Sequence, residues 1–254
     1  MKRTFFLCAR LFGIVTVVVL FGCAGTLPPA KPLDSERAAI GIAVKTRGPV
    51  KLFGSSKVDA VYFIKLDELD STAAASYQVQ SNQIMQSNYS KGGQMYLLNA
   101  VPGRYAVVAV FDSKSYPSTL SAPREVEYTT FFSKDLIKLT EVTVTPRSIV
   151  FMGDYVVDQS LGLKEADEAQ SYYFNLIVPG GSSGLLGMAF SGKNYYKGSL
   201  HEHKRDPQTE MNFFIKAQEH LQEAGWANLI QQRMDDLKAQ TPEKIITQKK
   251  GGIQ

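Results

Sequence analysis

The sequence predicts a mainly β protein, an antiparallel β-sandwich that carries packed α-helices at its C-terminus. Apolar runs rich in β-branched and aromatic residues recur through residues 38–178 and are separated by Gly, Pro, Asn and Asp. Helical periodicity appears only after residue 206. Strands therefore come first and helices last, and this order argues against an alternating parallel α/β sheet.

The strongest strand signal surrounds the Pro102-Gly103 pair, inside residues 92–112. Proline and glycine suit the two central positions of a type II turn, so the pattern predicts a hairpin. The arms at residues 95–98 and 106–110 are apolar at consecutive positions. Because alternate residues of a strand face opposite sides, both faces of these arms are expected to be buried.

Further strands are expected on both sides of this hairpin, at residues 38–45, 59–66, 83–89, 128–139, 141–145, 147–158 and 171–178. Gly153 interrupts the apolar run at 147–158 and suggests a β-bulge.

Two amphipathic helices are expected at the C-terminal end. Asp206-Pro207 is typical of a helix N-cap followed by proline at the first helical position, and Gly225 is a natural stop. The first apolar stripe comprises Met211, Phe214, Ile215 and Leu221, and the second comprises Trp226, Leu229, Ile230, Met234 and Leu237. These stripes could capture a partner helix or cover the sheet of the domain itself. We expect them to dock on the sheet with Trp226 as a buried anchor, because the central strands need a cover.

The N-terminus has the pattern of a secretory signal. Lys2, Arg3 and Arg10 precede an uncharged, mostly apolar run at residues 11–21, which is too short to span a membrane. The sequence Leu20-Phe21-Gly22-Cys23 then resembles the lipobox of bacterial lipoproteins. This resemblance implies cleavage before Cys23 and lipid attachment to it. Since residue 24 is alanine and not aspartate, it also implies sorting to the outer membrane.

These signals divide the chain into five parts. We expect a signal peptide at 1–22, the lipidated cysteine and a tether at 23–37, the β-sandwich domain at 38–200, a helical segment at 201–240 and a disordered tail at 241–254. Cys8 leaves with the signal, so the mature chain can form no internal disulfide. Loss of the signal also lowers the formal net charge from +4 to about +1, which gives no support for nucleic-acid binding.

The hairpin carries a second resemblance. Residues 99–105, Asn-Ala-Val-Pro-Gly-Arg-Tyr, resemble the Pro-Gly-x-Tyr hairpin of transthyretin-like and immunoglobulin-like β-sandwich modules. Together with the lipobox and the helix, Ala-Gly-Trp, helix ending, the chain resembles uncharacterised bacterial envelope lipoproteins. This resemblance implies no catalytic residues.

Two motifs suggest alternative chemistry. Residues 180–184 match the G-x-S-x-G pattern, with Ser182 as a nucleophile and Asp206 and His220 following in the order of a hydrolase triad. No helical stripe follows Ser182, so a glycine-rich loop is the favoured interpretation. His201 and His203 would share one face of an extended chain and could begin a zinc or copper site. A site needs three or four ligands and the only other histidine is His220, so a polar linker is favoured.

Paired tyrosines offer the one candidate ligand surface. Tyr172-Tyr173 and Tyr195-Tyr196 each place one ring on either side of a strand, so one ring of each pair can be exposed. The sequence therefore predicts a lipid-anchored, non-catalytic binding or structural module of the cell envelope, without cofactor or metal. Its expected partners are the membrane, through the lipid on Cys23, and another envelope protein or a glycan. The alternatives are a periplasm-facing serine hydrolase using Ser182 and a metal-binding module at His201 and His203.

Overall fold

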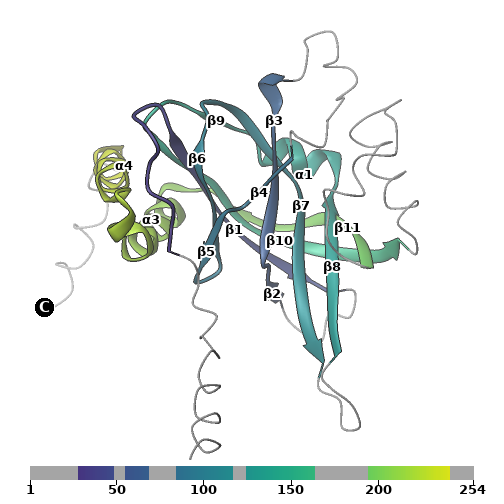
Figure 1. The fold of residues 1–254 in the computed structure, drawn as a ribbon. Coiled ribbons are helices and arrows are strands. Elements are labelled where there is room, and N and C mark those ends of the chain that lie inside the picture. The colour runs from purple at the N-terminus through teal and green to yellow at the C-terminus, as the bar shows by residue number, and fades with distance from the viewer. Residues whose placement is uncertain (1–27, 49–54, 69–83, 117–123, 164–193, 241–254) are drawn as a thin grey trace, which may run out of the picture.

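The protein is mainly β: one curled, mixed β-sheet forms a half-barrel, and two C-terminal helices pack on its outer face (Figure 1). This computed structural model describes residues 28–48, 55–68, 84–116, 124–163 and 194–240. The predicted C-terminal helices are present and packed on the sheet, but the predicted two-sheet antiparallel sandwich is wrong.

Within these ranges the main path of the sheet has the order β4-β3-β7-β8-β11-β10-β1-β6-β5, while β2 pairs with β1 and β9 with β7. The strands are β1 (Ala38–Arg47), β2 (Ser55–Lys57), β3 (Ala60–Lys65), β4 (Ile84–Gln86), β5 (Tyr89–Lys91), β6 (Gln94–Ala100), β7 (Gly103–Tyr116), β8 (Arg124–Phe132), β9 (Val142–Val144), β10 (Ile149–Leu163) and β11 (Asn194–Lys204). The β1–β10 and β8–β11 pairs are parallel, so the sheet is mixed.

The curl of the sheet has a covalent cause. The two edge strands, β4 and β5, follow each other in the chain and are separated only by Ser87 and Asn88. The Ser87 N–H donates to the Val61 carbonyl at 2.8 Å, and the Asn88 N–H donates to the Tyr96 carbonyl at 2.9 Å. Residues 84–91 thus pass from one edge to the other, so one sheet encloses its own inner face and needs no second sheet.

The Pro102-Gly103 pair does not close a hairpin. The flanking strands do not pair with each other, because β6 lies between β1 and β5 whereas β7 pairs with β3, β8 and β9. Gly103 has a φ of 149°, which differs from the value near 80° that a type II turn requires. Both arms are nevertheless buried on both faces, as their apolar runs predicted.

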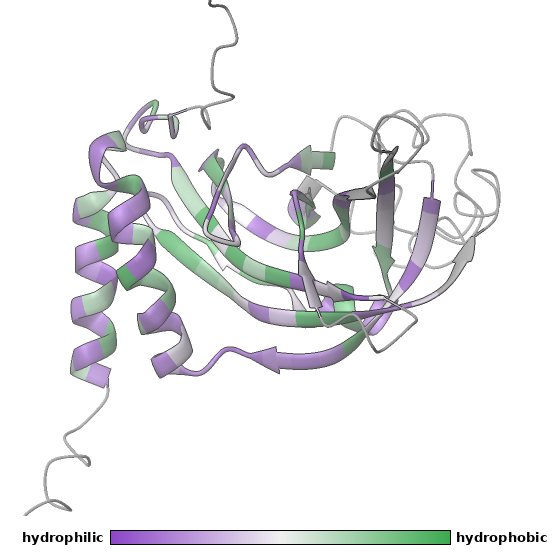
Figure 2. Ribbon diagram, turned by 90° about the horizontal axis from the view of Figure 1, so that it is seen from below, coloured by the Kyte–Doolittle hydropathy of each residue, from purple (hydrophilic) through white to green (hydrophobic). Residues whose placement is uncertain are grey.

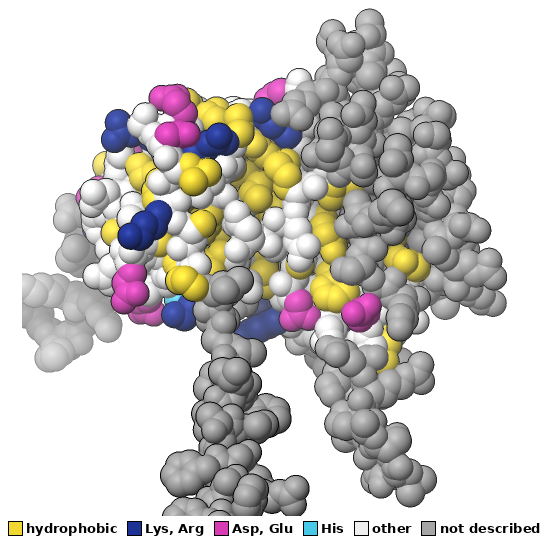
Figure 3. Space-filling view, in the orientation of Figure 1, with side chains coloured by type: hydrophobic (Ala, Val, Ile, Leu, Met, Phe, Trp, Pro, Cys, Tyr) yellow, Lys and Arg dark blue, Asp and Glu magenta, His cyan; other side chains and the backbone are white. Residues whose placement is uncertain are grey.

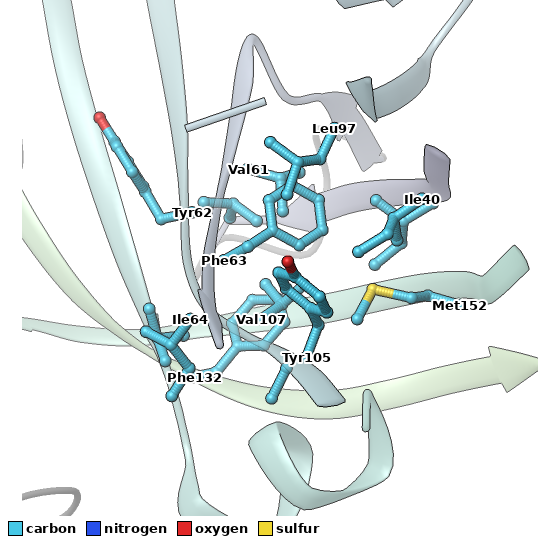
Figure 4. Close-up of a cluster of buried hydrophobic side chains, with 14 of the residues drawn as sticks. Ile40, Val61, Tyr62, Phe63, Ile64, Leu97, Tyr105, Val107, Phe132 and Met152 are labelled. Atoms are coloured by element: carbon cyan, nitrogen blue, oxygen red, sulfur yellow. The ribbon is translucent and has the colours of Figure 1, made fainter. Parts of the chain in front are cut away.

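The larger apolar cluster lies mainly on the inner face of the half-barrel. Its side chains point toward one another from opposite parts of the curled sheet, whereas Tyr62 points away (Figure 4); they include Ile40, Val61, Phe63, Leu97, Tyr105, Val107 and Met152. Helix α1 (Lys134–Leu139) adds Leu136 and Ile137 to this cluster. The sequence predicted a strand over 128–139, but the strand ends at Phe132 and the Ser133 side chain caps α1.

A second apolar cluster joins the outer face to helices α3 (Pro207–Leu221) and α4 (Ala227–Gln240). The Phe213 ring lies against Gly41 and packs on Phe151 with ring centroids 4.7 Å apart. Trp226 is fully buried in this cluster, so its predicted burial between the helices and the sheet is confirmed. In Figure 2 the strands nearest the helices are the most hydrophobic, whereas β11 is hydrophilic where it approaches α3.

The helix ends follow the predicted capping signals, with one correction to the stripe. The Asp206 side chain accepts from the N–H groups of Gln208 and Thr209, and Gly225 is left-handed at the end of a short 3-10 helix, η6 (Gln222–Ala224). Ile215, predicted to be buried, is 48% exposed, because the buried face runs through Phe213, Phe214, Ala217 and Leu221. Among the described elements, no helix is both long enough and apolar enough to cross a membrane.

Three further predictions concern β10, β11 and the termini. The bulge at Gly153 is confirmed by a register shift against β1 and a φ of 134°. Residues 201–204 belong to strand β11 and not to a linker before the helix. The predicted strand at 171–178, the signal at 1–22 and the tail at 241–254 lie outside the described residues.

The segment before β1 is attached to the domain. The Trp226 Nε1–H donates to the Ala30 carbonyl at 2.8 Å. Asn99 donates through Nδ2 to the Lys31 carbonyl at 2.9 Å and accepts through Oδ1 from the Leu33 N–H at 2.8 Å. Residues 30–33 are therefore held against the end of β6 and the start of α4.

Candidate functional site

The inner face of the sheet changes from apolar to polar along its strands. On β1, Val44 is followed on the same face by Thr46, and on β7, Val110 is followed by Asp112. The same change occurs on β8 and β10, at Thr130 and Gln159. We call these four residues the polar end; each is at most 5% exposed. Buried polar groups normally carry hydrogen bonds, so their partners decide what this region can do.

Only part of the polar end is satisfied by hydrogen bonds. Gln159 Nε2 donates to Thr130 Oγ1 at 2.9 Å. Lys114 Nζ lies 3.2 Å from Asp112 Oδ2 as an ion pair. Within the described part of the chain, however, neither Asp112 carboxylate oxygen accepts a hydrogen bond of good geometry, and the nearby Thr46 hydroxyl forms none of good geometry either. A carboxylate that is 1% exposed is thus short of partners.

The protonation of Asp112 reflects this setting. Burial raises the pKa of the Asp112 carboxyl above its ordinary value, and the Lys114 ammonium opposes that shift. The Asp59 carboxylate adds to the increase in pKa, whereas the Thr46 hydroxyl lies close enough to reduce it. Thr46 comes from β1 and Asp112 from β7, on opposite parts of the curled sheet, so the two side chains approach each other across the interior.

Two aromatic rings and a cation extend the polar end. Tyr196 lies opposite Thr130 in the parallel β8–β11 register, so it shares the inner face. The rings of Tyr196 and Tyr128 have centroids 5.7 Å apart, and Lys114 Nζ lies 5.2 Å from the centroid of Tyr128. The site thus combines a carboxylate, hydroxyls, an amide and aromatic surface.

The structure separates the tyrosines that the sequence grouped together. Tyr195 lies on the face opposite to Tyr196 and stacks on Phe131 with centroids 6.0 Å apart, where it packs against the outward-facing residues of the larger apolar cluster. Only Tyr196 therefore joins the polar end, as the expected one-ring-per-side geometry allows. Tyr172, Tyr173 and the lipidation residue Cys23 lie outside the described residues.

The parts of the proposed hydrolase triad that are described have other roles. Ser182 and the 180–184 motif lie outside the described residues. Asp206 is the N-cap of α3, and hydrogen bonds from Thr209 lower the pKa of its carboxyl. His220 sits on α3 beside the Gly92 turn, and burial lowers its pKa.

The two histidines of β11 do not share a face, in contrast to the sequence prediction. A register shift between Leu200 and Glu202 forms a bulge at residue 201. His201 Nδ1 consequently lies 3.3 Å from Asp158 Oδ2, and its Nε2 contacts Arg47, whereas His203 stacks on Tyr155 with ring centroids 4.6 Å apart. Asp158 and Tyr155 lie on opposite faces of β10. No group of three or more potential metal-ligating side chains occurs in the residues that the structure describes.

Asp112 was not identified from the sequence, although this residue lies two positions after the apolar arm at residues 106–110. An acidic residue at an inward-facing position of a strand is a recognisable signal once the strand register is fixed. The set at the polar end supplies hydrogen bonds, one buried charge and ring stacking, which suit the binding of a hydroxyl-rich ligand. No family model, curated protein or solved structure matches this chain.

Proposed function

We propose that this protein is a lipid-anchored, non-catalytic binding module of the cell envelope that holds a hydroxyl-rich ligand, an envelope glycan, at the polar end of its sheet. The observation that carries the proposal is the buried Asp112 carboxylate, which is paired with Lys114 but whose oxygens accept no hydrogen bond of good geometry within the described chain. A ligand hydroxyl would supply the missing donor, and charge-assisted hydrogen bonds of this kind are the stronger ones.

Support for the anchor comes from the N-terminal sequence and from the docked segment that follows it. Cys23 ends the uncharged run as the last residue of the lipobox-like sequence. Ala30, only seven positions later, is already bound by Trp226. Lipid on Cys23 would therefore hold the folded domain close to the membrane, with the outer membrane as the proposed location.

A binding role without catalysis fits the chemistry of the polar end. General acid–base catalysis needs a group that can take up and release a proton at the substrate, and nucleophilic catalysis needs a nucleophile placed against its base. The partner of Asp112 here is the Lys114 ammonium, which holds the carboxylate in place as a charge partner. Tyr128 and Tyr196 add stacking surface of the kind that sugar rings use.

The ligand proposal is tested by titrating the protein with soluble glycan fragments of the envelope and measuring affinity by calorimetry. Wild type should bind, and Asp112→Asn should bind about tenfold more weakly, because an amide lacks the charge that strengthens the hydrogen bond. Asp135→Asn, an exposed substitution on α1, serves as the matched control and should leave the affinity unchanged. Equal affinities in all three proteins would contradict the proposal.

The anchor is tested separately with radiolabelled palmitate. Cells that produce the wild-type protein should incorporate the label, and the mature protein should begin at a modified Cys23. Cys23→Ser should abolish labelling and leave the precursor unprocessed. A mature N-terminus at any other residue would refute the anchor and leave the ligand proposal standing.

A further inference from the structure

A basic groove lies between helix α3 and the outer face of the sheet, on the face opposite to the polar end. It has a volume of about 360 Å³ and is bounded by β1, β2, β11, α3 and the tight β5–β6 turn. Lys45, Lys57, Lys204 and Lys216 line it, with Asp154 as the one carboxylate of the lining. The groove therefore carries an excess of positive charge.

The carboxylates near the groove are concentrated around one of its lysines. Glu202 binds Lys204 at 2.8 Å, and Asp154 also acts on Lys204, whose pKa is raised chiefly by the Glu202 hydrogen bond. Lys45 is close enough to contribute to the lowered pKa of Glu202. Lys57 and Lys216, in contrast, form no ion pair with any described residue. Two exposed ammonium groups thus border the groove without an ion-pair partner in the described part of the chain.

The β5–β6 turn adds space and further positive charge beside the groove. Gly92 and Gly93 have φ values of 63° and 85°, as a type I′ turn requires, and they leave no side chain at the rim. Lys91 precedes them, and His220 packs against Gly92. Burial is the main cause of the lowered pKa of His220. The Lys91 and Lys216 ammonium groups lower this pKa further, and the Glu219 carboxylate opposes them. The local potential is therefore positive and favours an anion.

The groove lies close to the point where the chain leads toward Cys23. His220 contacts Gly92 at the rim and lies in the last turn of α3. Just beyond this helix, Gly225 packs against the Pro32 ring. The N-terminal end of the described chain lies beside β5 in Figure 1, and Figure 3 shows basic side chains and a histidine along the same lower edge. An extended chain covers about 3.5 Å per residue, so the seven positions from Cys23 to Ala30 span at most roughly 25 Å.

We propose that this groove binds the phosphate of an anionic phospholipid headgroup in the leaflet that holds the N-terminal lipid. This inference rests on the proposed anchor, which places the groove near headgroups. Lysines are point-charge phosphate binders, and basic residues close to a membrane attract its anionic lipids. A lipid phosphate that fills the groove would also fix the orientation of the domain on the membrane. The α3 side would then face the membrane, and the inner face of the sheet with its polar end would face away from it.

The test uses the full-length protein in a nonionic detergent and the short-chain lipid dihexanoyl phosphatidylglycerol as probe. Binding is measured by calorimetry at low salt, with dihexanoyl phosphatidylcholine and inorganic phosphate as comparison ligands. Phosphatidylglycerol should bind at least tenfold more tightly than either. Lys57→Gln/Lys216→Gln should weaken its binding about 30-fold, roughly fivefold for each lysine.

Lys134→Gln/Lys138→Gln is the matched control, because both lysines are exposed on α1 and the change in net charge is the same. This variant should bind phosphatidylglycerol as the wild type does. Equal weakening in both variants, equal binding of the two lipids, or equally tight binding of inorganic phosphate would each overturn the proposal. The titration does not depend on lipid at Cys23. If palmitate labelling failed, the proposed anchor would be refuted, whereas the titration would still test the phosphate-binding groove.

Discussion

The two ends of the inner face of the half-barrel differ in how their side chains are satisfied: one end is packed with apolar side chains, and the other buries polar groups. At the apolar end, side chains such as Phe63, Tyr105 and Val107 fill the space from opposite sides of the curl (Figure 4). At the polar end, Thr46 and Asp112 approach each other and remain short of hydrogen bonds in the described chain. The first arrangement maximises stability, whereas the second costs stability and is the pattern expected where a site is retained for binding.

Glycines on β1 and just after it show the same contrast in available space. A side-chain carbon on Gly41 would lie 2.5 Å from Phe213 Cζ, beneath the helices. Among the described residues, a side-chain carbon on Gly48, just after β1, would meet Gln159 Oε1 alone, at 3.9 Å. The chain is therefore tightly packed at Gly41 and has more space at Gly48.

The largest expected effect follows from removing the anchor of the helix-covered half. Trp226→Ala should lower the free energy of unfolding by about 3–5 kcal/mol, because it empties a fully buried site and removes the hydrogen bond to Ala30. Chemical denaturation measures this loss. Ile215→Ala, on the exposed side of α3, should change stability by no more than about 0.5 kcal/mol. A similar small loss in Trp226→Ala would show that the helices do not stabilise the sheet.

A smaller effect should separate the two glycines. Gly41→Ala should destabilise the protein by about 1–3 kcal/mol, because the added methyl group overpacks the buried Phe213 ring. The same substitution at Gly48 should be nearly neutral, since 3.9 Å is an ordinary van der Waals separation. Thermal melting of the two variants side by side measures the difference. Equal melting temperatures would contradict the difference in available space between these two positions.

Local features of this fold could be predicted from the sequence because their causes are local. The Asp206 cap, the Gly153 bulge and the burial of Trp226 each depend on residues close in the chain or on the period of the apolar pattern. The curl could not be predicted in this way. It depends on residues 84–91 changing partners between β3 and β6, and on the parallel pairing of β1 with β10, more than 100 positions later.

The candidate site was predictable only in part, for the same reason. The alternation of Tyr195 and Tyr196 across a strand could be predicted, but which ring lies on the inner face depends on the β8–β11 register. Asp112 becomes notable only when Thr46 is known to lie near it across the curled sheet, 66 positions away in sequence. The bulge that separates His201 from His203 likewise arises from pairing with β10 and has no local signal.

The smallest expected effect is the loss of stability caused by burying the Asp112 carboxylate. This loss depends on pH, because it disappears when Asp112 is protonated. Its folded-state pKa lies above the ordinary value of 3.8, so the folded protein retains a proton at pH values where the unfolded chain has lost it. Stability contributed by this group therefore falls as pH rises through the window that begins near 3.8. An uncharged amide at the same position has no such dependence.

The most direct measurement is the unfolding free energy of Asp112→Asn and wild type at pH 7 and at pH 3. At pH 7 the variant should be more stable by about 1 kcal/mol, because relief of the buried charge exceeds the loss of the partly exposed pair with Lys114. At pH 3, where Asp112 is protonated in both states of the wild-type protein, the difference should disappear. If the variant is instead less stable by the same amount at both pH values, Asp112 is a structural residue and the polar end is not a site maintained at the cost of stability.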